Sequence, residues 1–301
     1  VRCSSEQIVI VSGIQQALDL LARFLLKRGD PVWMEDPGYF GATIAFASAG
    51  ARMVGVPVDE EGLSVSAGKK LCPHAKGVYL TPAHQFPLGV TMSLERRMAL
   101  LDWASRSGAF VIEDDYDSEY RFEGQPVPSL QSLDENSNVI LIGSFSKTLF
   151  PSLRLGYIVM PPSLVDYFLS FRNRTDFRNL NVDQAVLCDF IVEGHLARHL
   201  RRMRDLYASR LEALIDGGNK YLGGLLEISN VRAGLYTVGF LRNGMTSRQA
   251  EKAAAARGVE AIGIDRYTLK APDPNGLLLG FAAHTETAIR RALARLSAAL
   301  S

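Results

Sequence analysis

Short apolar segments alternate with helical repeats over the first 160 residues of the chain. Continuous runs such as Val139–Ile142 are typical of strands buried on both faces, whereas Leu94–Arg106 has the spacing of an amphipathic helix. This pattern predicts strands at 8–11, 32–34, 52–57, 78–80, 110–112, 139–142 and 155–160, and helices at 15–26, 39–49 and 94–106. Strands separated by helices predict a largely parallel sheet of the α/β class, in a strand order that the pattern leaves open.

The pattern changes near residue 163, where helical spacing begins to dominate. A very basic helix is expected over 195–216, ended by glycines at 217 and 218. Beyond it we predict strands at 225–228, 235–240, 259–264 and 277–281, with helices at 247–257 and 285–300. We therefore expect a large domain at 1–194, a long interdomain helix at 195–216 and a smaller C-terminal α+β domain at 217–301.

Composition excludes several classes of protein. The chain has 301 residues, 47% of them apolar and 22% charged, which is typical of a globular protein with a large core. Its formal charge of +1 provides no overall basic field, so we expect any DNA contact to be made by another segment. Three widely spaced cysteines without a CxxC pair argue against a disulfide framework or thiolate metal site and favour a reducing cytoplasm.

Two further features of the chain concern its context. It contains neither an apolar stretch of about 18 residues nor a basic-then-apolar leader, so we expect no membrane span and no signal peptide. It opens with Val1, and the pattern typical of folded structure starts within the first few residues. We therefore expect this chain to be a domain of a longer protein.

The segment Ser144–Tyr157 carries the most specific chemistry. It places Lys147 among small hydroxyls, with Arg154 seven residues further on. A deprotonated lysine amine can form a Schiff base with the aldehyde of pyridoxal 5'-phosphate, while serine hydroxyls and an arginine hold the phosphate. The segment could equally be an ordinary turn after a buried strand, because serine, lysine and proline are common in loops.

Other residues with suitable chemistry follow predicted strands, where ligands of parallel sheets bind. The first turn after Ser12 could hold a phosphate through its amides, although serine is also a common helix cap. Tyr39 could stack on a planar cofactor or simply pack.

The acidic segment Glu113–Asp117 follows another predicted strand. Asp114 could keep a pyridine nitrogen protonated, and Tyr116, on the same side of an extended chain, could hydrogen-bond the ring oxygen O3'. A solvated acidic loop and a divalent-metal site are the alternatives, but the metal site lacks clustered histidines or a glycine-punctuated loop.

Six motifs together resemble one family. They are Ser-Gly-x-Gln-Gln-Ala-Leu at 12–18, Glu-Asp-Pro-Gly-Tyr at 35–39, Thr-Pro-Ala-His-Gln-Phe-Pro-Leu-Gly at 81–89, Glu-Asp-Asp-Tyr-Asp-Ser-Glu-Tyr at 113–120, Ser-Phe-Ser-Lys at 144–147 and Arg-His-Leu-Arg-Arg-Met-Arg at 198–204. In this order, over essentially the whole chain, they resemble the aminotransferase-like domain of MocR-type regulators, which belong to the GntR superfamily. The resemblance implies the fold type I architecture of pyridoxal-phosphate enzymes, with a mostly parallel large domain and a smaller C-terminal α+β lobe.

The resemblance also implies roles for individual residues. Lys147 is the expected Schiff-base lysine, Asp114 the partner of the pyridine nitrogen, Tyr116 the neighbour of O3' and Tyr39 the residue stacked on the ring. The expected phosphate cup consists of Gly13, Ile14, Gln15, Ser144, Ser146 and Arg154. His84 and Gln85 stand where ordinary aminotransferases carry Asn-Pro-x-Gly, so His84 is counted among the cofactor-binding residues with its contact left open.

The chain departs from ordinary aminotransferases at two places. The arginine that grips the substrate carboxylate in the Arg-Leu-Ser-Phe motif is replaced by Leu278. Arg266 is our substitute candidate for an effector or substrate carboxylate, although an exposed structural arginine fits the same pattern. We also expect the N-terminal arm, which in this fold reaches the partner subunit's site, to lie outside this chain.

The basic helix holds residues that could suggest other functions. His195 and His199 are four residues apart but lack an HExxH pattern, so packing or salt-bridge roles are favoured over metal binding. Its arginines suit a solvated helix that pairs with acidic partners better than phosphate-backbone binding.

These observations lead to three functional hypotheses. The first is the effector-sensing domain of a MocR-type transcriptional regulator that holds pyridoxal phosphate as a Schiff base and responds to an amino compound. The second is a catalytically active aminotransferase, in which Lys147 moves the substrate Cα proton. In the third, pyridoxal phosphate itself is the signal. We expect a cytoplasmic homodimer that binds DNA only through an N-terminal domain outside this chain, without metal or membrane.

Overall fold

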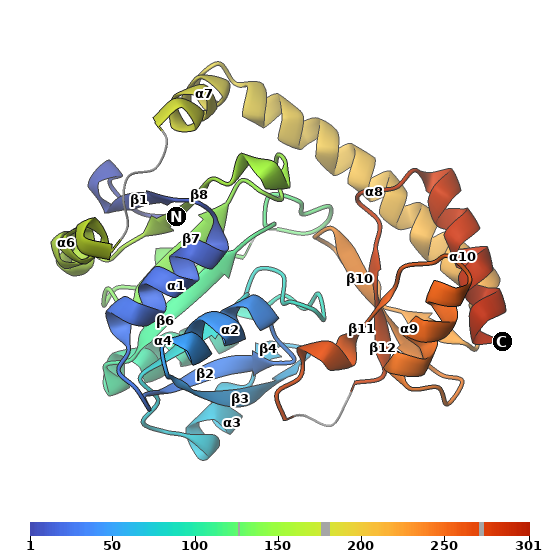
Figure 1. Ribbon diagram of the computed structural model, residues 1–301, viewed down its shortest axis with the longest axis horizontal. Helices are drawn as coiled ribbons and strands as arrows, with labels where there is room; N and C mark the ends of the chain where they lie inside the picture. The colour runs from blue at the N-terminus through green and yellow to red at the C-terminus, as the bar shows by residue number, and fades with distance from the viewer. Residues whose placement is uncertain (126, 176–180, 271–273) are drawn as a thin grey trace. The chain divides into compact units, whose positions relative to one another are not determined.

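A computed structural model describes residues 1–125, 127–175, 181–270 and 274–301 (Figure 1). By its internal contacts the chain forms two compact units. Unit 1 comprises Val1–Gln85, Val90–Asp117 and Pro126–Leu196, and unit 2 comprises Phe86–Gly89, Ser118–Gln125 and Ala197–Ser301. The chain thus enters unit 2 twice for short segments, directly after Gln85 and directly after Asp117, before it stays there.

Unit 1 is built on an eight-stranded sheet in the order β1-β8-β7-β6-β5-β2-β3-β4. The central strands β7, β6, β5, β2 and β3 are parallel, whereas β8 pairs antiparallel with both β7 and β1, and β4 pairs antiparallel with β3. The strands are β1 (Ile8–Val11), β2 (Pro31–Asp36), β3 (Arg52–Asp59), β4 (Gly62–Leu63), β5 (Gly77–Leu80), β6 (Phe110–Asp115), β7 (Val139–Ser144) and β8 (Gly156–Val159). The predicted, largely parallel α/β sheet is confirmed.

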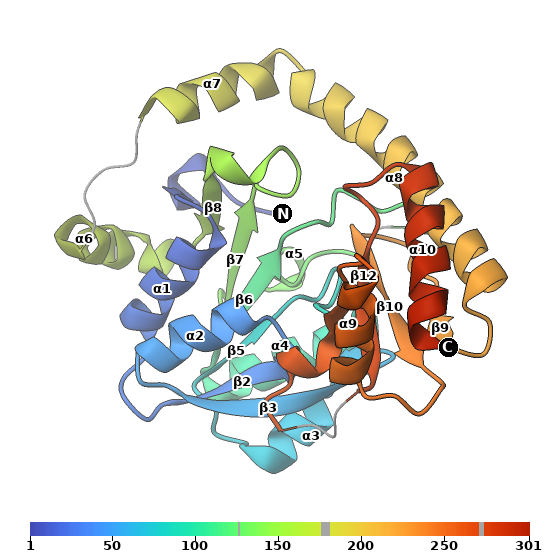
Figure 2. The same ribbon diagram turned by 45° about the vertical axis from the view of Figure 1, so that its right-hand side comes forward.

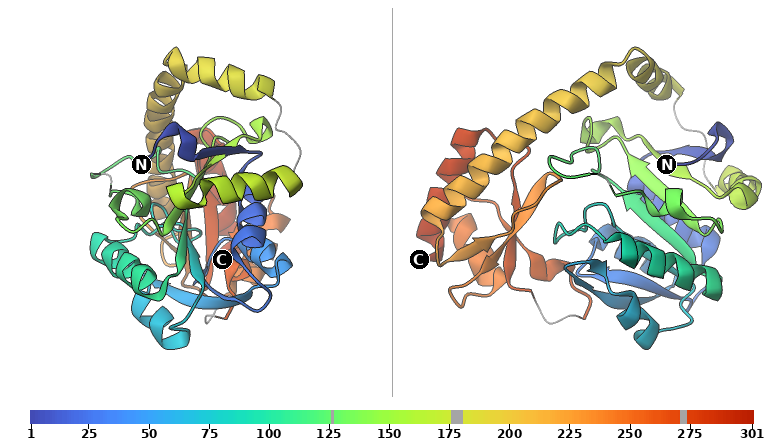
Figure 3. Two further views of the ribbon diagram at one scale, coloured as in Figure 1. Left: turned by 90° about the vertical axis from the view of Figure 1, so that its left-hand side faces the viewer. Right: turned by 180° about the vertical axis from the view of Figure 1, so that it is seen from behind.

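Helices cover both faces of this sheet. Figures 1 and 3 show α1 (Ile14–Leu25) and α2 (Phe40–Ser48) over one face and α4 (Leu94–Ser107) over the other. Helix α4 begins where the Ser93 hydroxyl accepts a hydrogen bond from the amide of Arg96, and it ends at Gly108, which adopts the left-handed conformation. The other helices of this unit are α3 (Val65–Leu71), α5 (Leu130–Leu133), α6 (Val165–Thr175) and α7 (Asn181–Val192), with short 3-10 turns at Ser5–Gln7, Pro151–Leu153 and Pro162–Leu164.

The core of unit 1 explains why the central strands read as continuous apolar runs. Strands β5 and β7 are buried along their whole length, so both faces carry apolar side chains. Under α3 and α4, the rings of Trp33 and Trp103 stack with centroids 3.7 Å apart. Both indole nitrogens donate to backbone carbonyls, those of Cys72 and Pro73, which satisfies their polar atoms inside the core.

Unit 2 contains a four-stranded antiparallel sheet in the order β11-β12-β10-β9. Its strands are β9 (Leu226–Ile228), β10 (Tyr236–Leu241), β11 (Ile262–Gly263) and β12 (Gly276–Gly280), and its helices are α8 (His195–Tyr221, whose first two residues group with unit 1), α9 (Ser247–Ala256) and α10 (Glu286–Leu300). Figure 2 shows α8 and α10 side by side. Leucines and alanines from α8, α9 and α10 form one core with the buried residues of β12.

The predicted end of the basic helix at residue 217 is wrong. Gly217 and Gly218 lie inside α8, which continues to Tyr221. A Cβ atom at Gly217 would lie 2.6 Å from Leu293 Cδ1, and one at Gly218 would lie 2.3 Å from Ile228 Cδ1. These glycines therefore serve the close approach of α10 and β9 to the helix rather than its termination.

The predicted strand at 259–264 is also shorter than expected. Only Ile262 and Gly263 pair with β12, and a 3-10 turn at Ile264–Tyr267 follows directly. Val259 and Ala261 are apolar because they pack in the core of unit 2. Among the described residues, no helix is long and apolar enough to cross a membrane.

Candidate functional site

Two parallel strands of unit 1 bring Asp114 and the segment that carries Lys147 to neighbouring strand ends. Strands β6 and β7 run in the same direction, with Asp114 opposite Ile142 and Asp115 opposite Gly143. The segments that follow the carboxyl ends of these two strands therefore begin next to each other in space. Lys147 lies just beyond the end of β7, in an exposed position within the turn that Leu149 closes by donating its amide to the Phe145 carbonyl at 2.8 Å.

Asp114 lies at the end of β6 with a carboxylate that is only 3% exposed. Its Oδ2 accepts a hydrogen bond from the Tyr79 hydroxyl at 2.7 Å, whereas its Oδ1 is buried and has no partner among the described residues. Burial raises the pKa of this carboxyl to about 7, and the hydrogen bond from Tyr79 partly opposes the shift. A buried acceptor without a donor is costly, and the N–H of a protonated pyridine ring is a donor that would satisfy it.

Tyr39 forms the N-cap of α2 and is partly buried. Its ring lies over Gly41, where a Cβ atom would come within 2.5 Å of Tyr39 Cζ, so a larger residue at this position would displace the ring. Burial and the charge of Asp114 raise the pKa of the Tyr39 hydroxyl, while the charge of Arg154 lowers it. Tyr39 thus lies within electrostatic reach of both Asp114 and Arg154.

Three of the residues predicted for the phosphate cup lie at the first turn of α1. Gly13 is the N-cap of this helix at φ +100°, a conformation that favours glycine, and Ile14 and Gln15 begin the helix. Gln15 Nε2 donates to the carbonyl of Gly41 at 3.0 Å, which joins the first turns of α1 and α2. The amides of a helix's first turn point outward and favour an anion.

Arg154 places a cation near this first turn. It is exposed, it has a left-handed backbone at φ +51°, and its Cζ lies 4.0 Å from where a Gly13 Cβ would be. A non-glycine residue in this conformation is strained, and such strain is common at functional sites. On the adjoining segment, Ser146 donates its amide to Ser144 Oγ at 3.0 Å.

The half-buried Tyr116 forms a hydrogen-bonded group with the buried His84 and with a buried residue that the sequence did not single out, Asp117. The Tyr116 hydroxyl donates to the His84 carbonyl at 2.7 Å and lies 3.1 Å from His84 Nδ1. Asp117 Oδ2 lies 2.9 Å from the same Nδ1, and His84 and Asp117 are each 1% exposed. Asp117 lies in the motif 113–120 among several other acidic residues, and nothing in the sequence distinguished it from them.

Two other buried residues also escaped sequence reasoning. Tyr79 holds Asp114, and Glu35 Oε2 accepts from the Thr81 amide at 3.0 Å and from its hydroxyl at 2.7 Å. Burial raises the pKa of Glu35 to about 7. Tyr79 sits within a continuous apolar run, so its hydroxyl carried no signal, whereas Glu35 at the end of a predicted strand could have been suspected.

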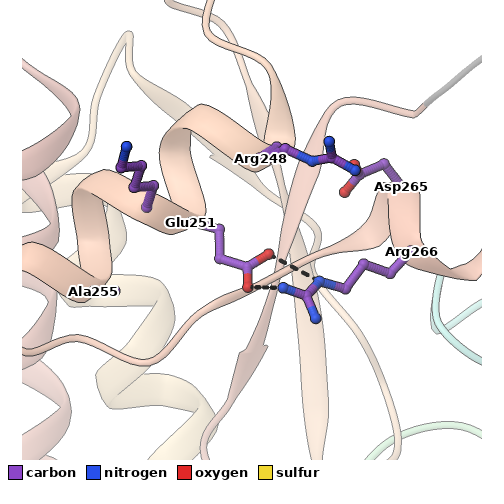
Figure 4. Close-up of a pocket in the computed structure, with 6 residues that line it drawn as sticks. Arg248, Glu251, Ala255, Asp265 and Arg266 are labelled. Carbon is purple, nitrogen blue, oxygen red and sulfur yellow. Dashed lines mark hydrogen bonds and ion pairs between the residues drawn. The ribbon is translucent and has the colours of Figure 1, made fainter.

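Arg266 lies in unit 2, at a surface hollow of about 520 Å³ formed by α9 and the turn before β12 (Figure 4). The hollow is lined by Arg248, Glu251, Lys252, Ala255, Asp265 and Arg266. Figure 4 shows Nε and Nη2 of Arg266 directed at the two carboxylate oxygens of Glu251, in a bidentate ion pair. This pairing is what a structural arginine makes, and a role for Arg266 in carboxylate binding stays a prediction.

The histidines of the basic segment have structural partners. His195 Nε2 lies 3.0 Å from Glu193 Oε2, and its ring stacks on Phe190 with centroids 5.4 Å apart. Within the described ranges, no cluster of three or more histidine, cysteine or acidic side chains could hold a metal ion.

Comparisons with known proteins agree with this geometry. The family model described as aminotransferase class I and II matches residues 1–296. The probable rhizopine catabolism regulatory protein MocR of Rhizobium meliloti is 43% identical over 282 residues, which cover 94% of this chain and 57% of that protein. The uncharacterized HTH-type transcriptional regulator YdeL of Bacillus subtilis is 34% identical over 299 residues, which cover 99% of this chain and 64% of that protein. The chain thus spans less than two thirds of each relative.

A solved structure is similar over nearly the whole chain. The kynurenine aminotransferase of Pyrococcus horikoshii, in complex with PMP, with KYN as substrates and KYA as products, is 30% identical and superimposes with a TM-score of 0.90. The match covers 97% of this chain and 74% of that one. The resemblance to aminotransferase-like domains of MocR-type regulators is confirmed by the relatives, and the type I fold by this structure. The chain therefore belongs to the class I and II aminotransferase family.

Proposed function

We propose that this chain is the effector-sensing part of a cytoplasmic transcriptional regulator of the MocR type, with pyridoxal phosphate bound covalently to Lys147. The main support for the cofactor is the buried Oδ1 of Asp114, which accepts no hydrogen bond from the described residues. The N–H of a protonated pyridine ring would supply the missing donor. The similarity to MocR and YdeL supports the regulatory function.

We assign the cofactor contacts of this chain to residues of unit 1. When bound, pyridoxal phosphate supplies an electron-withdrawing ring and an aldehyde that condenses with amines. Lys147 would provide the amine, and Asp114 would hold the proton of the ring nitrogen at Oδ1. The protonated ring would in turn favour the charged carboxylate and lower the pKa of Asp114 from about 7. Tyr39 would cover the ring.

The phosphate is assigned to the first turn of α1 and to Arg154. The amides of Ile14 and Gln15 supply hydrogen-bond donors at a helix N-terminus, and the left-handed backbone of Arg154 directs its guanidinium toward Gly13. Ser144 and Ser146 complete this set from the end of β7. A dianion held by arginine and amide donors is a strong, charge-assisted arrangement.

The chain lacks the arginine that binds the substrate carboxylate in ordinary aminotransferases, which favours effector sensing over catalytic turnover. Leu278 lies on β12, where its neighbours are Val238 and Ile262 in the sheet of unit 2, and leucine cannot bind a carboxylate. Arg266, which we propose as a substitute, is engaged with Glu251. An aminotransferase remains the alternative function, because Lys147, Asp114 and Tyr116 are all present.

The regulator proposal includes partners outside this chain. We propose that DNA is bound by an N-terminal domain of the whole protein and that the whole protein is a homodimer. An amino compound, or pyridoxal phosphate itself, would shift the protein between two states only if its affinity differs between them.

The test uses the full-length protein loaded with pyridoxal phosphate and a panel of amino compounds. The proposal predicts that at least one compound changes the visible spectrum of the bound cofactor and the affinity for operator DNA, without catalytic release of an oxo acid. Repeated turnover to an oxo acid with DNA binding unchanged would instead establish the aminotransferase. A DNA response to pyridoxal phosphate alone, with no response to any amine, would identify the cofactor as the signal.

A further inference from the structure

The surface hollow of unit 2 is lined almost entirely by charged side chains, and most of these charges are unpaired. Glu251 and Arg266 neutralise each other in their bidentate ion pair. The other charged lining residues, Arg248, Lys252 and Asp265, form no ion pair with any residue in the described ranges. The hollow therefore presents two cations and one carboxylate that are open to a ligand.

Both walls of the hollow are fixed by hydrogen bonds. Helix α9 begins with a reciprocal cap, in which Thr246 Oγ1 accepts from the Gln249 amide at 3.3 Å and the Gln249 side chain accepts from the Thr246 amide at 2.9 Å. Buried alanines of this helix pack in the core of unit 2. Glu251 joins α9 to the opposite wall, because its Oε2 accepts from the Gly263 amide at 3.1 Å as well as from Arg266. The charges of the hollow thus lie on a rigid frame.

The two cations lie on the same face of α9. Arg248 and Lys252 are four residues apart and exposed, and like charges at this spacing destabilise a helix. Glu251, the carboxylate that shares this face, is engaged by Arg266. Ala255, one turn beyond Glu251, has a side chain too short to fill the hollow. An anionic ligand would relieve the repulsion between the two cations.

Asp265 supplies the opposite charge from the other wall. A Cβ atom at Gly263 would lie 2.4 Å from Asp265 Oδ1, so this carboxylate lies against the Gly263 backbone. The same Oδ1 is buried without a hydrogen-bond partner in the described part of the chain, which is a costly state for a carboxylate. Figure 4 shows the Arg248 guanidinium extending from α9 toward Asp265, with no ion pair between the two. An ammonium group would supply the donors that Asp265 lacks.

We propose that this hollow binds an acidic amino acid, with its two carboxylates on Arg248 and Lys252 and its ammonium group on Asp265. The three charges of such a ligand match the three unpaired charges of the hollow one for one. The volume of about 520 Å³ also lies within the range of small-molecule sites. This site goes beyond the proposed function, because neither the cofactor nor any residue of unit 1 takes part in it. Arg266 keeps its pair with Glu251.

The experiment is isothermal titration calorimetry of the full-length protein with L-glutamate and two analogues that each lack one charge. L-Glutamine lacks the second carboxylate, and glutarate lacks the ammonium group. We expect a Kd for L-glutamate on the order of 1 mM, and binding of each analogue that is weaker by about fivefold, as for loss of one exposed ion pair. Absence of L-glutamate binding up to about 10 mM would overturn the proposal. Glutarate binding as tight as that of L-glutamate would overturn it as well.

Variants of the two cations locate the binding. Arg248→Gln and Lys252→Gln should each weaken L-glutamate binding by about fivefold. Neither should lower the free energy of unfolding, because each removes one of two like charges. The matched control is Arg257→Gln, since Arg257 is an exposed residue at the C-cap of α9, outside the hollow. Unchanged affinity in both hollow variants, or equal weakening in the control, would overturn the proposal.

Asp265→Asn tests the ammonium contact through selectivity. The preference of wild type for L-glutamate over glutarate should disappear in this variant, because the carboxylate that attracts the ammonium group is gone. A preference that persists would overturn the assignment of Asp265. If Asp265→Asn does not fold, the titrations of Arg248→Gln and Lys252→Gln still decide the proposal.

The proposed function and this inference fail in different ways. The titrations are repeated with Lys147→Ala, which removes the proposed point of cofactor attachment and should leave L-glutamate binding at the hollow unchanged. Loss of L-glutamate binding in Lys147→Ala would place the ligand at the cofactor site and overturn this inference. A wild-type protein that binds L-glutamate at the hollow but shows no visible band with pyridoxal phosphate would refute the proposed function alone.

Discussion

Replacing Asp114 by asparagine should stabilise the ligand-free protein at high pH. Burial raises the pKa of this carboxyl from 3.8 to about 7. Because the folded pKa lies above the unfolded one, the folded state binds more protons between about pH 4 and about pH 7, and stability decreases as the pH rises through that range. A difference of about 3 pH units corresponds to about 4 kcal/mol of destabilisation at pH 8.

Asparagine removes that charge but introduces a buried amide nitrogen. Its oxygen can still accept from the Tyr79 hydroxyl, whereas its unpaired N–H groups cost about 1–3 kcal/mol. The net gain expected for Asp114→Asn at pH 8 is therefore about 1–3 kcal/mol, and near pH 4, where only the cost of the buried amide remains, the variant should be less stable than wild type by about 1–3 kcal/mol. Glu35 and Glu113, whose pKa values also lie near 7, are present in both proteins and cancel in the difference.

The assay is urea unfolding of the ligand-free protein at about pH 5 and about pH 8, for wild type and Asp114→Asn. In parallel, Asp114→Asn should weaken pyridoxal phosphate binding by about tenfold or more, because the ring nitrogen loses a charged partner. A variant that is less stable than wild type at pH 8, or a stability gain that does not vary with pH, would refute the reasoning.

Three further substitutions test other contacts. Arg154→Gly should relieve the strain of a left-handed backbone and raise the free energy of unfolding by about 1 kcal/mol. Affinity for the cofactor should fall, and a lower free energy of unfolding would contradict the strain argument. Gly156→Ala would place a Cβ 2.8 Å from a backbone oxygen, so urea unfolding should show a loss of about 1–3 kcal/mol, whereas the control Gly280→Ala has open space and should change little. Arg266→Ala breaks an exposed ion pair with Glu251, so a loss above about 1 kcal/mol would be unexpected; a selective loss of amine response would support its carboxylate role.

The sequence predicted the elements of unit 1 well because its central strands are buried on both faces. Val139–Ile142 is apolar at every position, and such runs bounded by helices have few other interpretations. Strand order and the antiparallel direction of β1 and β8 depend on pairings between distant segments, which periodicity does not encode. Gly217 and Gly218 misled the helix prediction because their role is set by side chains of α10 and β9.

The candidate site was predictable where residue chemistry and strand ends coincide. Asp114 and Lys147 each follow an apolar run, so both position and chemistry pointed to them. Asp117 was missed because its partner, His84, is 33 residues away and meets it only after the two strand ends come together. The contact of Arg266 with Glu251 likewise joins α9 to a later turn, and no local sequence pattern predicts it.

Covalent attachment of pyridoxal phosphate to Lys147 can be located by reduction and peptide mapping. The full-length protein is mixed with the cofactor, reduced with borohydride and digested, and the labelled peptide is identified by mass spectrometry, with Lys147→Ala as the control. The account predicts a visible absorbance band in wild type, a label on Lys147 alone, and neither band nor label in the variant. Absence of the band from wild type, or a label on another lysine, would contradict it.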